Sequence, residues 1–470
     1  MGVRVMSAPI PGSRAEILRL AWPILVSMLS FSLKGFVDTM MVGRLGTDAL
    51  GAVGIASVAT WAAITFPWGV LRGQRPLVSQ YLGAGQPQLA FSFGVHAIYL
   101  ALAWGVMLFA LAGPLSGLVS QFVGSTRIGP EGVGIAEDYF ALRLRWAMPL
   151  LCFFAIAEYL RSTGRTRMPM VVDLVSHPLN MLFNYALIYG NLGMPKLGAR
   201  GAAIGTGLAD TCALLLLLWI LLNERRRAQP PGRLRLGEAL RFRWERIREV
   251  TKIGMTGGLQ FAFETYAFLA ITWLVGRTEQ KVALAVHQAG IQLIHLSLMP
   301  AIAVADAASV LIGRAVGALR WEEVSRTLRS ALEIVIPFMG AMSLLFLLAG
   351  RELCGLILRD QDPATREIAL QLGAGVMAAA ALWQIGDALQ VVFRFALRAT
   401  GDHRWVMATG ILCSWVLSLP LVAWVVFTLK GDVTQVWLVW TAEIFIGDAI
   451  FVWRWRSGAW RARRLVKDGA

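Results

Sequence analysis

Charged residues are scarce in this sequence. They make up 16% of its 470 residues, whereas about 25% is usual for a soluble globular chain. Residues of the apolar class make up 57%, so a soluble fold could not cover its surface with polar groups. A membrane protein does not have to, because lipid is the solvent of its outer face. The composition therefore excludes an ordinary soluble domain.

The motifs of common enzyme and cofactor sites are also missing. The sequence has no GxxxxGK[ST] phosphate loop, no HExxH zinc motif, no GxSxG nucleophile motif and no CxxC pair. Its four cysteines are Cys152, Cys212, Cys354 and Cys413. All lie in or beside apolar stretches, where we expect free thiols that pack. We predict neither an enzyme nor a bound cofactor, so any work must draw on an ion gradient or on the solute's own gradient.

Twelve apolar stretches are present instead. Each is close to the roughly 20 residues that a membrane-spanning helix needs. They cover approximately 17–42, 49–71, 90–120, 137–160, 168–190, 201–223, 250–275, 281–305, 327–350, 367–393, 404–428 and 433–455. The first is too long for a cleaved signal peptide and lacks a small-residue cleavage pattern. We therefore predict an all-α membrane protein with 12 transmembrane helices.

The two halves of the chain resemble each other. Val-Gly-Arg at 42–44 recurs at 275–277. Leu-Arg-Ser-Thr-Gly at 160–164 recurs as Leu-Arg-Ala-Thr-Gly at 397–401, at nearly the same spacing. Copies of six helices share one orientation, so the two should be related by a pseudo-twofold axis along the membrane normal.

This repeat predicts the organisation of the chain. We expect an amino-terminal six-helix lobe at 1–223, a basic cytoplasmic linker at 224–249, and a carboxy-terminal six-helix lobe with a basic tail at 250–470. Two lobes that rock against each other suit alternating access, which a receptor or a membrane enzyme does not need.

The net charge of +15 raises the question of nucleic-acid binding, but its distribution indicates membrane topology. Arginines crowd the two tails and the segments after even-numbered stretches, among them Arg72, Arg75, Arg161, Arg165, Arg394 and Arg398. By the positive-inside rule, this bias places both termini in the cytoplasm. We predict a multi-pass protein with no nucleic-acid partner.

Three acidic residues inside the stretches are the main candidates for function, because a charge within a span is costly unless it is paired, hydrated or facing a cavity. Asp38 lies in the first stretch, one turn after Lys34, with which it could form a local ion pair. Glu264 and Asp387 lie in the seventh and tenth stretches. Without basic partners nearby in sequence, these two acids are expected to form one cation site.

Neutral polar residues are weaker candidates. Asn180 and Asn184 lie one turn apart, and with Tyr185 and Thr206 they could supply neutral oxygen ligands or simply join helices by hydrogen bonds. Three further residues in the spans are interpreted as structural: Glu443, Asp448 and His287.

Several segments together resemble a known family. Val-Asp-Thr-Met-Met-Val-Gly-Arg-Leu-Gly at 37–46 looks like the first-helix signature of the multidrug and toxic compound extrusion (MATE) family. Residues 184–203 resemble the region of spans 5 and 6 in its NorM-like branch. Segments 285–288, 387–392 and 397–402 match its second half, so the resemblance covers nearly the whole chain.

The resemblance implies a 12-helix antiporter. It assigns Asp38 as the coupling carboxylate of the amino lobe, and Glu264 and Asp387 as the cation-site acids of the carboxy lobe, where they would be Na⁺ ligands. The supporting polar ligands expected around these acids are Lys34, Asn180, Asn184, Thr206, Gln260, Trp383 and Gln384.

The sequence departs from the family pattern in three places. Asn184 stands where many relatives have an aspartate, and Trp383 where NorM-like relatives tend to have a tyrosine. The first change removes one negative charge from an amino-lobe Na⁺ site, and the second removes one possible oxygen ligand. Lys34 beside Asp38 favours proton coupling over Na⁺ at that position.

These observations predict an exporter of organic cations, driven by Na⁺ or H⁺ and working as a single chain in a bacterial inner membrane. Two alternatives stay open. A lipid-linked oligosaccharide flippase of the same superfamily should carry basic, phosphate-binding residues in its cavity. A non-transporting membrane sensor or scaffold should keep its function when Asp38, Glu264 and Asp387 are neutralised.

Overall fold

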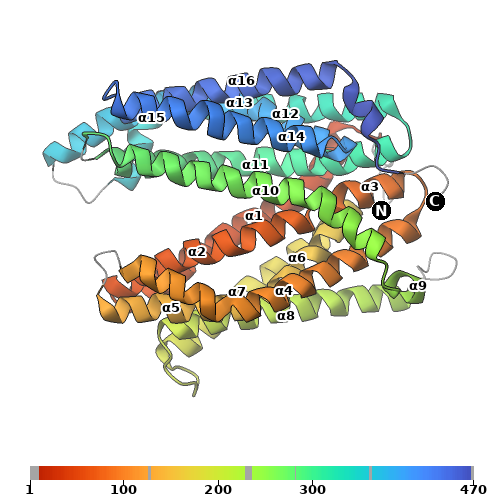
Figure 1. Cartoon of the computed structure of the whole chain (residues 1–470), viewed down its shortest axis with the longest axis horizontal. Coiled ribbons are helices and arrows are strands. Elements are labelled where there is room, and N and C mark those ends of the chain that lie inside the picture. The colour runs from red at the N-terminus through yellow and green to blue at the C-terminus, as the bar shows by residue number, and fades with distance from the viewer. Residues whose placement is uncertain (1–9, 125–128, 228–235, 281, 359–362, 467–470) are drawn as a thin grey trace, which may run out of the picture. The chain divides into compact units, whose positions relative to one another are not determined.

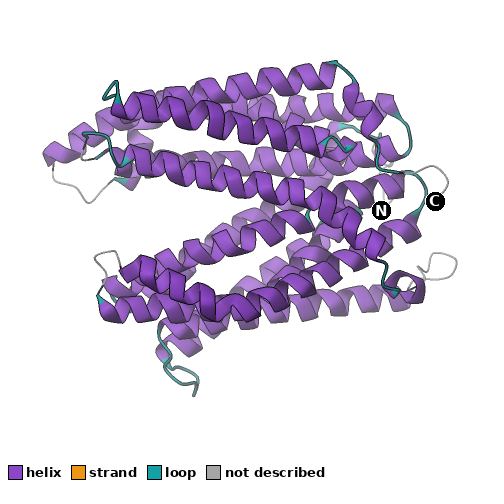
Figure 2. Ribbon diagram, in the orientation of Figure 1, coloured by secondary structure: helices purple, strands orange, loops and turns teal. Residues whose placement is uncertain are grey.

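The structure, a computed structural model, describes residues 10–124, 129–227, 236–280, 282–358 and 363–466. Every regular element in these residues is a helix (Figures 1 and 2). Backbone N–H and C=O groups have no water to bond within hydrocarbon, so each spanning segment must satisfy its own, and a helix does so. The predicted all-α membrane fold is confirmed.

The chain divides into two compact units. The amino unit is Pro23–Gly258, and the carboxy unit joins the chain up to Trp22 to the chain from Leu259 onward. Both limits fall within helices, namely α1 (Arg14–Gly43) and α10 (Trp244–Val275). The first turns of α1 are tied to the carboxy unit by Arg14, whose Nε donates to Glu333 Oε2 at 2.7 Å.

The remaining helices each lie within one unit. The amino unit holds α2 (Thr47–Leu71), α3 (Gln74–Gly83), α4 (Pro87–Gly124), α5 (Pro130–Arg145), α6 (Ala147–Ser162), α7 (Arg167–Tyr189), α8 (Ala199–Arg227) and α9 (Leu236–Leu240). The carboxy unit holds α11 (Ala283–Gly317), α12 (Trp321–Ile357), α13 (Pro363–Thr400), α14 (His403–Ile411), a π-helix (Leu412–Ser418), α15 (Leu419–Phe427), α16 (Val433–Arg456) and a 3-10 helix (Ala459–Arg463).

Ten helices among the described residues are long and apolar enough to cross a bilayer, when α2 is counted with α3 and α14 with α15. The pair α5 and α6, bent by 46° at the break between them, makes eleven if it is one span. The expected fifth stretch is helix α7, which does not qualify because it carries Asp173, His177, Asn180 and Asn184. The count of twelve therefore stays a prediction.

Glycines bring α10 against α2 in the amino unit. A Cβ added to Gly69 would lie 2.6 Å from the Cα of Gly258. Gly73, just after α2, and Gly254 on α10 also meet backbone to backbone. Small residues four apart let helices pack closely without a hydrophobic driving force, as is common in membranes.

The core of the carboxy unit gathers around Trp437 of α16. Its fully buried ring packs against Gly290 of α11 and Val376 of α13. The indole Nε1 donates to His287 Nδ1 at 3.1 Å, and His287 Nε2 lies 3.2 Å from Thr272 Oγ1. His287 therefore packs and forms hydrogen bonds, as predicted from the sequence.

One arginine that the sequence placed between spans lies inside the fold. Arg75 belongs to α3 and forms a buried ion pair with Glu158 of α6. Arg75 can lie within the helix and not in a loop because a buried guanidinium is tolerated when a carboxylate pairs with it. The four cysteines are free thiols, as expected.

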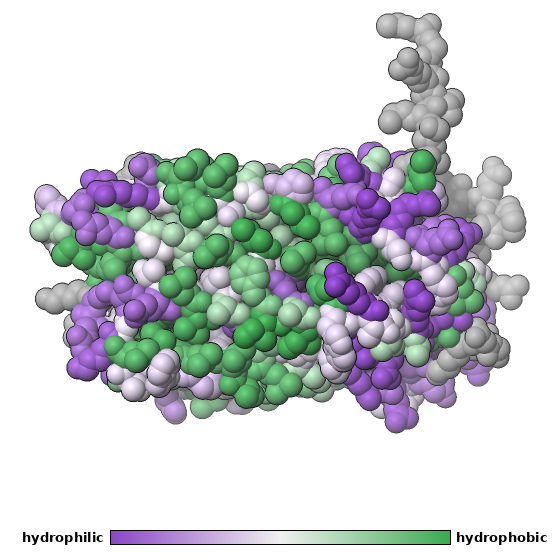
Figure 3. All heavy atoms as spheres, turned by 90° about the horizontal axis from the view of Figure 1, so that it is seen from above, coloured by the Kyte–Doolittle hydropathy of each residue, from purple (hydrophilic) through white to green (hydrophobic). Residues whose placement is uncertain are grey.

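Apolar side chains cover the middle of the face drawn in Figure 3, and hydrophilic ones gather at both ends. On α12 alone, Leu344, Leu347 and Leu348 are all exposed. Exposed apolar surface of this extent would be costly in water, and it is what lipid requires.

Candidate functional site

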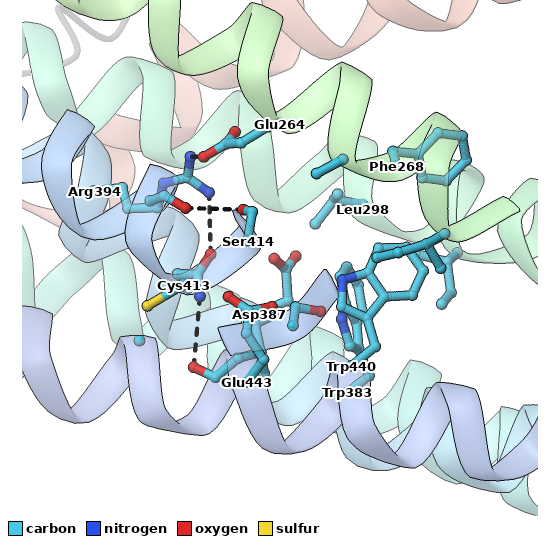
Figure 4. A pocket seen from close by; sticks show the side chains of 18 of the residues that line it. Glu264, Phe268, Leu298, Trp383, Asp387, Arg394, Cys413, Ser414, Trp440 and Glu443 are labelled. Carbon is cyan, nitrogen blue, oxygen red and sulfur yellow. Dashed lines mark hydrogen bonds and ion pairs between the residues drawn. The ribbon is translucent and has the colours of Figure 1, made fainter. Parts of the chain in front are cut away.

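The carboxy unit encloses a cavity of about 300 Å³. Helices α10, α11, α13 and α16 and the π-helix contribute to its wall (Figure 4). The principal lining residues are Glu264, Phe268, His295, Trp383, Asp387, Gln390, Arg394, Cys413, Ser414, Trp437, Trp440 and Glu443. The cavity thus has three carboxylates, one guanidinium and an aromatic side.

Glu264 is not the unpaired acid that the sequence suggested. Its carboxylate forms an ion pair with Arg394 of α13, and its Oε1 also accepts a hydrogen bond from Gln260 Nε2 at 2.7 Å. Arg394 was placed between spans because the tenth stretch was taken to end at 393. The structure extends α13 to Thr400, so the arginine lies inside the helix and reaches Glu264.

Gln260 links this pair to a second arginine. Arg398 Nη2 donates to Gln260 Oε1 at 2.6 Å, so a chain of polar side chains joins α10 to α13. Gly410 of α14 completes the arrangement, since a Cβ there would lie 2.8 Å from Glu264 Oε1. Two of the predicted site residues, Gln260 and Glu264, are thus in contact one turn apart on α10.

Asp387 lies in the same cavity in a different environment. Its side chain is 8% exposed, and its Oδ2 has no hydrogen-bond partner among the described residues. Figure 4 shows its carboxylate in the space between Glu443 and Trp440. Gln384, one turn earlier on α13, does not line the cavity, and its Nε2 donates to Ser297 of α11.

The aromatic side of the cavity includes Trp383, which the sequence analysis gave as a supporting ligand of the acids. Its ring lies 6.0 Å from that of Trp440, and Trp440 lies 5.5 Å from Trp437. Phe268 of α10 approaches Trp440 at 6.1 Å. Aromatic faces beside carboxylates attract organic cations through both charge and the ring quadrupole.

Sequence reasoning missed one acid of this site. Glu443 of α16, interpreted as structural, lines the cavity with Asp387. Asp448, farther along α16, is 5% exposed and does not line the cavity, and neither of its carboxylate oxygens has a hydrogen-bond partner in the described chain. The available signal was the one used for Glu264, namely an acid in an apolar stretch with no basic residue one turn away.

The amino unit brings together the predicted cluster around Asp38. Asn184 Nδ2 donates to Asp38 Oδ1 at 2.8 Å. Asn180 Nδ2 donates to Thr206 Oγ1 at 3.2 Å, and its own Oδ1 lies 3.5 Å from Asn184 Nδ2. Tyr185 does not join them, since its side chain is 49% exposed.

Lys34 pairs with a different acid from the one that the sequence suggested as its partner. Its Nζ lies 3.5 Å from Oδ1 of Asp210 on α8, and Arg143 Nη1 lies 3.5 Å from the other oxygen, Oδ2. The expected local ion pair with Asp38 is not formed in the described structure. The buried Asp210 lies between the two cations, and Asp38 accepts a hydrogen bond from Asn184.

A ready-made metal site is not among these groups. In the described ranges no three His, Cys, Asp or Glu side chains are placed to hold a metal ion. The assignment of Glu264 and Asp387 as Na⁺ ligands stays a prediction.

Comparison with known proteins gives a consistent result. The model of the MatE family matches this chain twice, at residues 23–186 and 258–424. A protein of Pseudomonas syringae pv. tomato described as a probable multidrug resistance protein NorM is 29% identical over 466 residues, covering 97% of this chain and 96% of its own. The protein of that description in Bacillus licheniformis is 27% identical over 409 residues, covering 86% and 87%.

Solved structures share the fold. A multidrug resistance MATE family transporter of the MOP superfamily in an outward-facing conformation superposes with a TM-score of 0.84 at 18% identity, over 95% of this chain and 96% of its own. A MOP superfamily transporter from Pyrococcus furiosus, described as having a binding pocket of reverse polarity that suggests a different function, gives the same TM-score, identity and coverage.

Proposed function

This chain belongs to the MatE family, and we propose that it exports organic cations across a bacterial inner membrane by antiport with Na⁺ or H⁺. The relatives described as probable multidrug resistance proteins support the substrate class. The observation that carries the proposal is the polarity of the carboxy-unit cavity, where Glu264, Asp387 and Glu443 outnumber Arg394 and face an aromatic side.

The charges and size of the cavity suit a planar cation. Three carboxylates against one guanidinium leave an excess of negative charge in a low-dielectric setting, where attraction for a cation is stronger than in water. A volume of about 300 Å³ is at the lower end of the usual range for ligand pockets. The tryptophans provide faces on which a flat cation can stack.

Coupling follows from competition for the same acids. Asp387, buried and without a hydrogen-bond donor on Oδ2, is a place for a proton or a Na⁺ ion arriving from outside. That ion would displace the organic cation when the lobes have rocked to the outward-facing state. A ligand drives such a change only through unequal affinity for the two states, so the coupling ion must prefer the state that releases the drug.

Asp38 is the proposed coupling carboxylate of the amino unit. It accepts a hydrogen bond from Asn184, whereas the nearby Lys34 and Arg143 form their ion pairs with Asp210. A proton taken up or released there would alter the bond to Asn184 and so affect the contact between α1 and α7.

The orientation and the working unit are also proposals. The arginine bias places both termini in the cytoplasm, and the two units within one chain make a monomer sufficient for alternating access. Cysteine accessibility at an introduced terminal cysteine, measured from each side of sealed vesicles, would test the orientation.

The flippase alternative is less well supported by this cavity. A phosphate-binding cavity should present free basic groups, but Arg394 is already paired with Glu264. The scaffold alternative gives no reason for three acids to face one cavity. The transport experiment below tests both alternatives, because each predicts that the protein exports no ethidium.

The test is ethidium efflux from sealed vesicles or whole cells under an imposed Na⁺ or H⁺ gradient. Wild type should export ethidium under one of the gradients, which identifies the coupling ion. Glu264→Gln and Asp387→Asn should slow export at least tenfold while reaching the membrane in normal amounts. If wild type moves no cation under either gradient, drug export is refuted, and transport of lipid-linked sugars is the assay to follow.

A further inference from the structure

Arg394 is a cation built into a cavity that should receive cations. It lies two turns after Asp387 on α13, so both side chains are on the same face of the helix. Its guanidinium pairs with Glu264, and Nη1 also donates to Gln390 Oε1 at 3.0 Å. Figure 4 shows the guanidinium between Glu264 and the carboxylates of Asp387 and Glu443. An arginine side chain does not lose its proton at physiological pH, so no proton can switch this charge off.

The pair is placed where it can open. The side chains of Arg394 and Glu264 are 21% and 26% exposed, and both line the cavity. The buried pair of Arg75 and Glu158 is 8% and 6% exposed by comparison. A cation that enters the cavity therefore reaches a carboxylate whose partner is partly exposed and can be displaced.

Acceptors for a displaced guanidinium are close by. Gln390 already accepts from Arg394 and lies one turn before it on α13. Asp387 has an oxygen without a partner in the described chain, and Glu443 lines the same cavity. The guanidinium can thus leave Glu264 without being stranded in a low-dielectric space, which would otherwise cost several kcal/mol.

We propose that Arg394 is a tethered competitor, which occupies Glu264 in the empty cavity and is displaced by the transported cation. The proposal rests on the proposed binding of organic cations in this cavity. A bound cation then gains its ion pair with Glu264 only at the expense of the ion pair between Glu264 and Arg394. The arginine therefore lowers the affinity for every cationic substrate. Its return to Glu264 promotes release. The competition acts only on charged ligands, so an uncharged molecule of the same shape should not sense it.

The experiment measures equilibrium binding to the purified full-length protein by tryptophan quenching. The probes are ethidium, a monocation, and phenanthridine, its ring system without the fixed charge. Arg394→Gln should lower the Kd of ethidium about tenfold, equivalent to about 1.4 kcal/mol. The Kd of phenanthridine should change less than twofold. Arg394→Lys keeps the positive charge, so its Kd for ethidium should stay closer to that of wild type than to that of Arg394→Gln.

A second comparison covers the case in which Arg394→Gln does not fold. In Glu264→Gln the arginine has lost its partner and should pair with Asp387 or Glu443, so ethidium binding should weaken at least tenfold. The double variant Glu264→Gln/Arg394→Gln removes both charges of the pair. The double variant should bind ethidium at least fivefold more tightly than Glu264→Gln does.

The inference is overturned if Arg394→Gln weakens ethidium binding, leaves it unchanged, or shifts both probes together, since a purely structural ion pair would do so. It is also overturned if the double variant binds ethidium no better than Glu264→Gln. Failure of the proposed function is a separate result: wild type would then bind and transport no ethidium at all. Wild-type export together with an unfavourable variant pattern removes only the role of Arg394.

Discussion

Gly410 of α14 stands directly against Glu264 of α10, with room for a hydrogen atom but not for a methyl group. A Cβ at position 410 would lie 2.8 Å from Glu264 Oε1 and 2.5 Å from Gln260 Nε2. The Glu264 carboxylate, which pairs with Arg394, is therefore in close contact with the backbone of α14 at Gly410. The placement of this acid depends on three helices at once.

Gly410→Ala should disturb the site without changing any charge. Overpacking of this kind costs about 1–3 kcal/mol, which we expect to appear as Glu264 turned out of its pairing with Arg394. Ethidium efflux should fall at least about tenfold. Gly340→Ala on α12, where an added Cβ has nothing within 4 Å, is the matched control. Equal ethidium efflux rates in Gly410→Ala and Gly340→Ala would show that the site tolerates the added methyl group, and would contradict this prediction.

The glycines in the contact between α2 and α10 should tolerate an added side chain as poorly as Gly410 does. A Cβ at Gly254 would overlap the carbonyl of Val70, so Gly254→Ala must push the helices apart. We expect a melting temperature several degrees lower for the detergent-solubilised protein, from a cost of about 1–3 kcal/mol. Gly54→Ala, in open space on α2, should melt like wild type. A normal melting curve for Gly254→Ala would show that this packing contributes little.

The buried ion pair of Arg75 and Glu158 allows a double-variant test. Arg75→Met removes the ion-pair partner of the buried Glu158 and leaves Arg72 and Arg161 as the cations near it, at a cost of up to about 3–5 kcal/mol. Arg75→Met/Glu158→Met removes both charges and should regain most of the lost thermal stability. Arg200 and Asp138 form an ion pair that is 62% and 41% exposed, and breaking it should cost less than about 1 kcal/mol. A double variant no more stable than the single would contradict the pairing.

Asn184→Asp tests the amino-unit cluster. The change removes the donor to Asp38 Oδ1 and places two carboxylates side by side, which then need a shared proton or a cation. Ethidium efflux should become several-fold more dependent on external Na⁺ or on external acid than in wild type. Asn184→Leu, which removes the donor and adds no charge, should show no such dependence. An identical ion response in all three proteins would separate this cluster from coupling.

Much of the fold was predictable because one physical rule dominates it. Long apolar stretches must be helical in lipid, and the stretches at 49–71 and 433–455 match α2 and α16 at nearly their full lengths. The limits near charged residues were harder. The tenth stretch was ended at its first arginine, although α13 continues to Thr400, because a sequence alone does not show that Arg394 has a partner 130 residues away.

Two of the three acids of the cavity were predicted, and its arginine was missed. Glu264 and Asp387 stand out because each is an acid in an apolar stretch with no basic residue one turn away. Partners are set by tertiary contacts, so Lys34 was assigned to the acid one turn away and is instead beside Asp210. Glu443 carried the same signal as Glu264, but nothing in its neighbourhood told which face of α16 turns toward the cavity.

The π-helix Leu412–Ser418, whose residues Cys413, Ser414 and Ser418 face the cavity, has a consequence for the length of its span. A π turn accommodates one residue more than the α-helix around it. Loss of a single residue from this segment would therefore let the span become regular while α14 and α15 kept their relative rotation, because the π turn already absorbs the extra residue. Loss of a residue from α14 or α15 themselves would turn the rest of the span by about 100°, so that its bilayer-facing and cavity-facing sides would no longer match their surroundings. The π-helix is thus the place in this span where the chain can lose one residue and keep its faces.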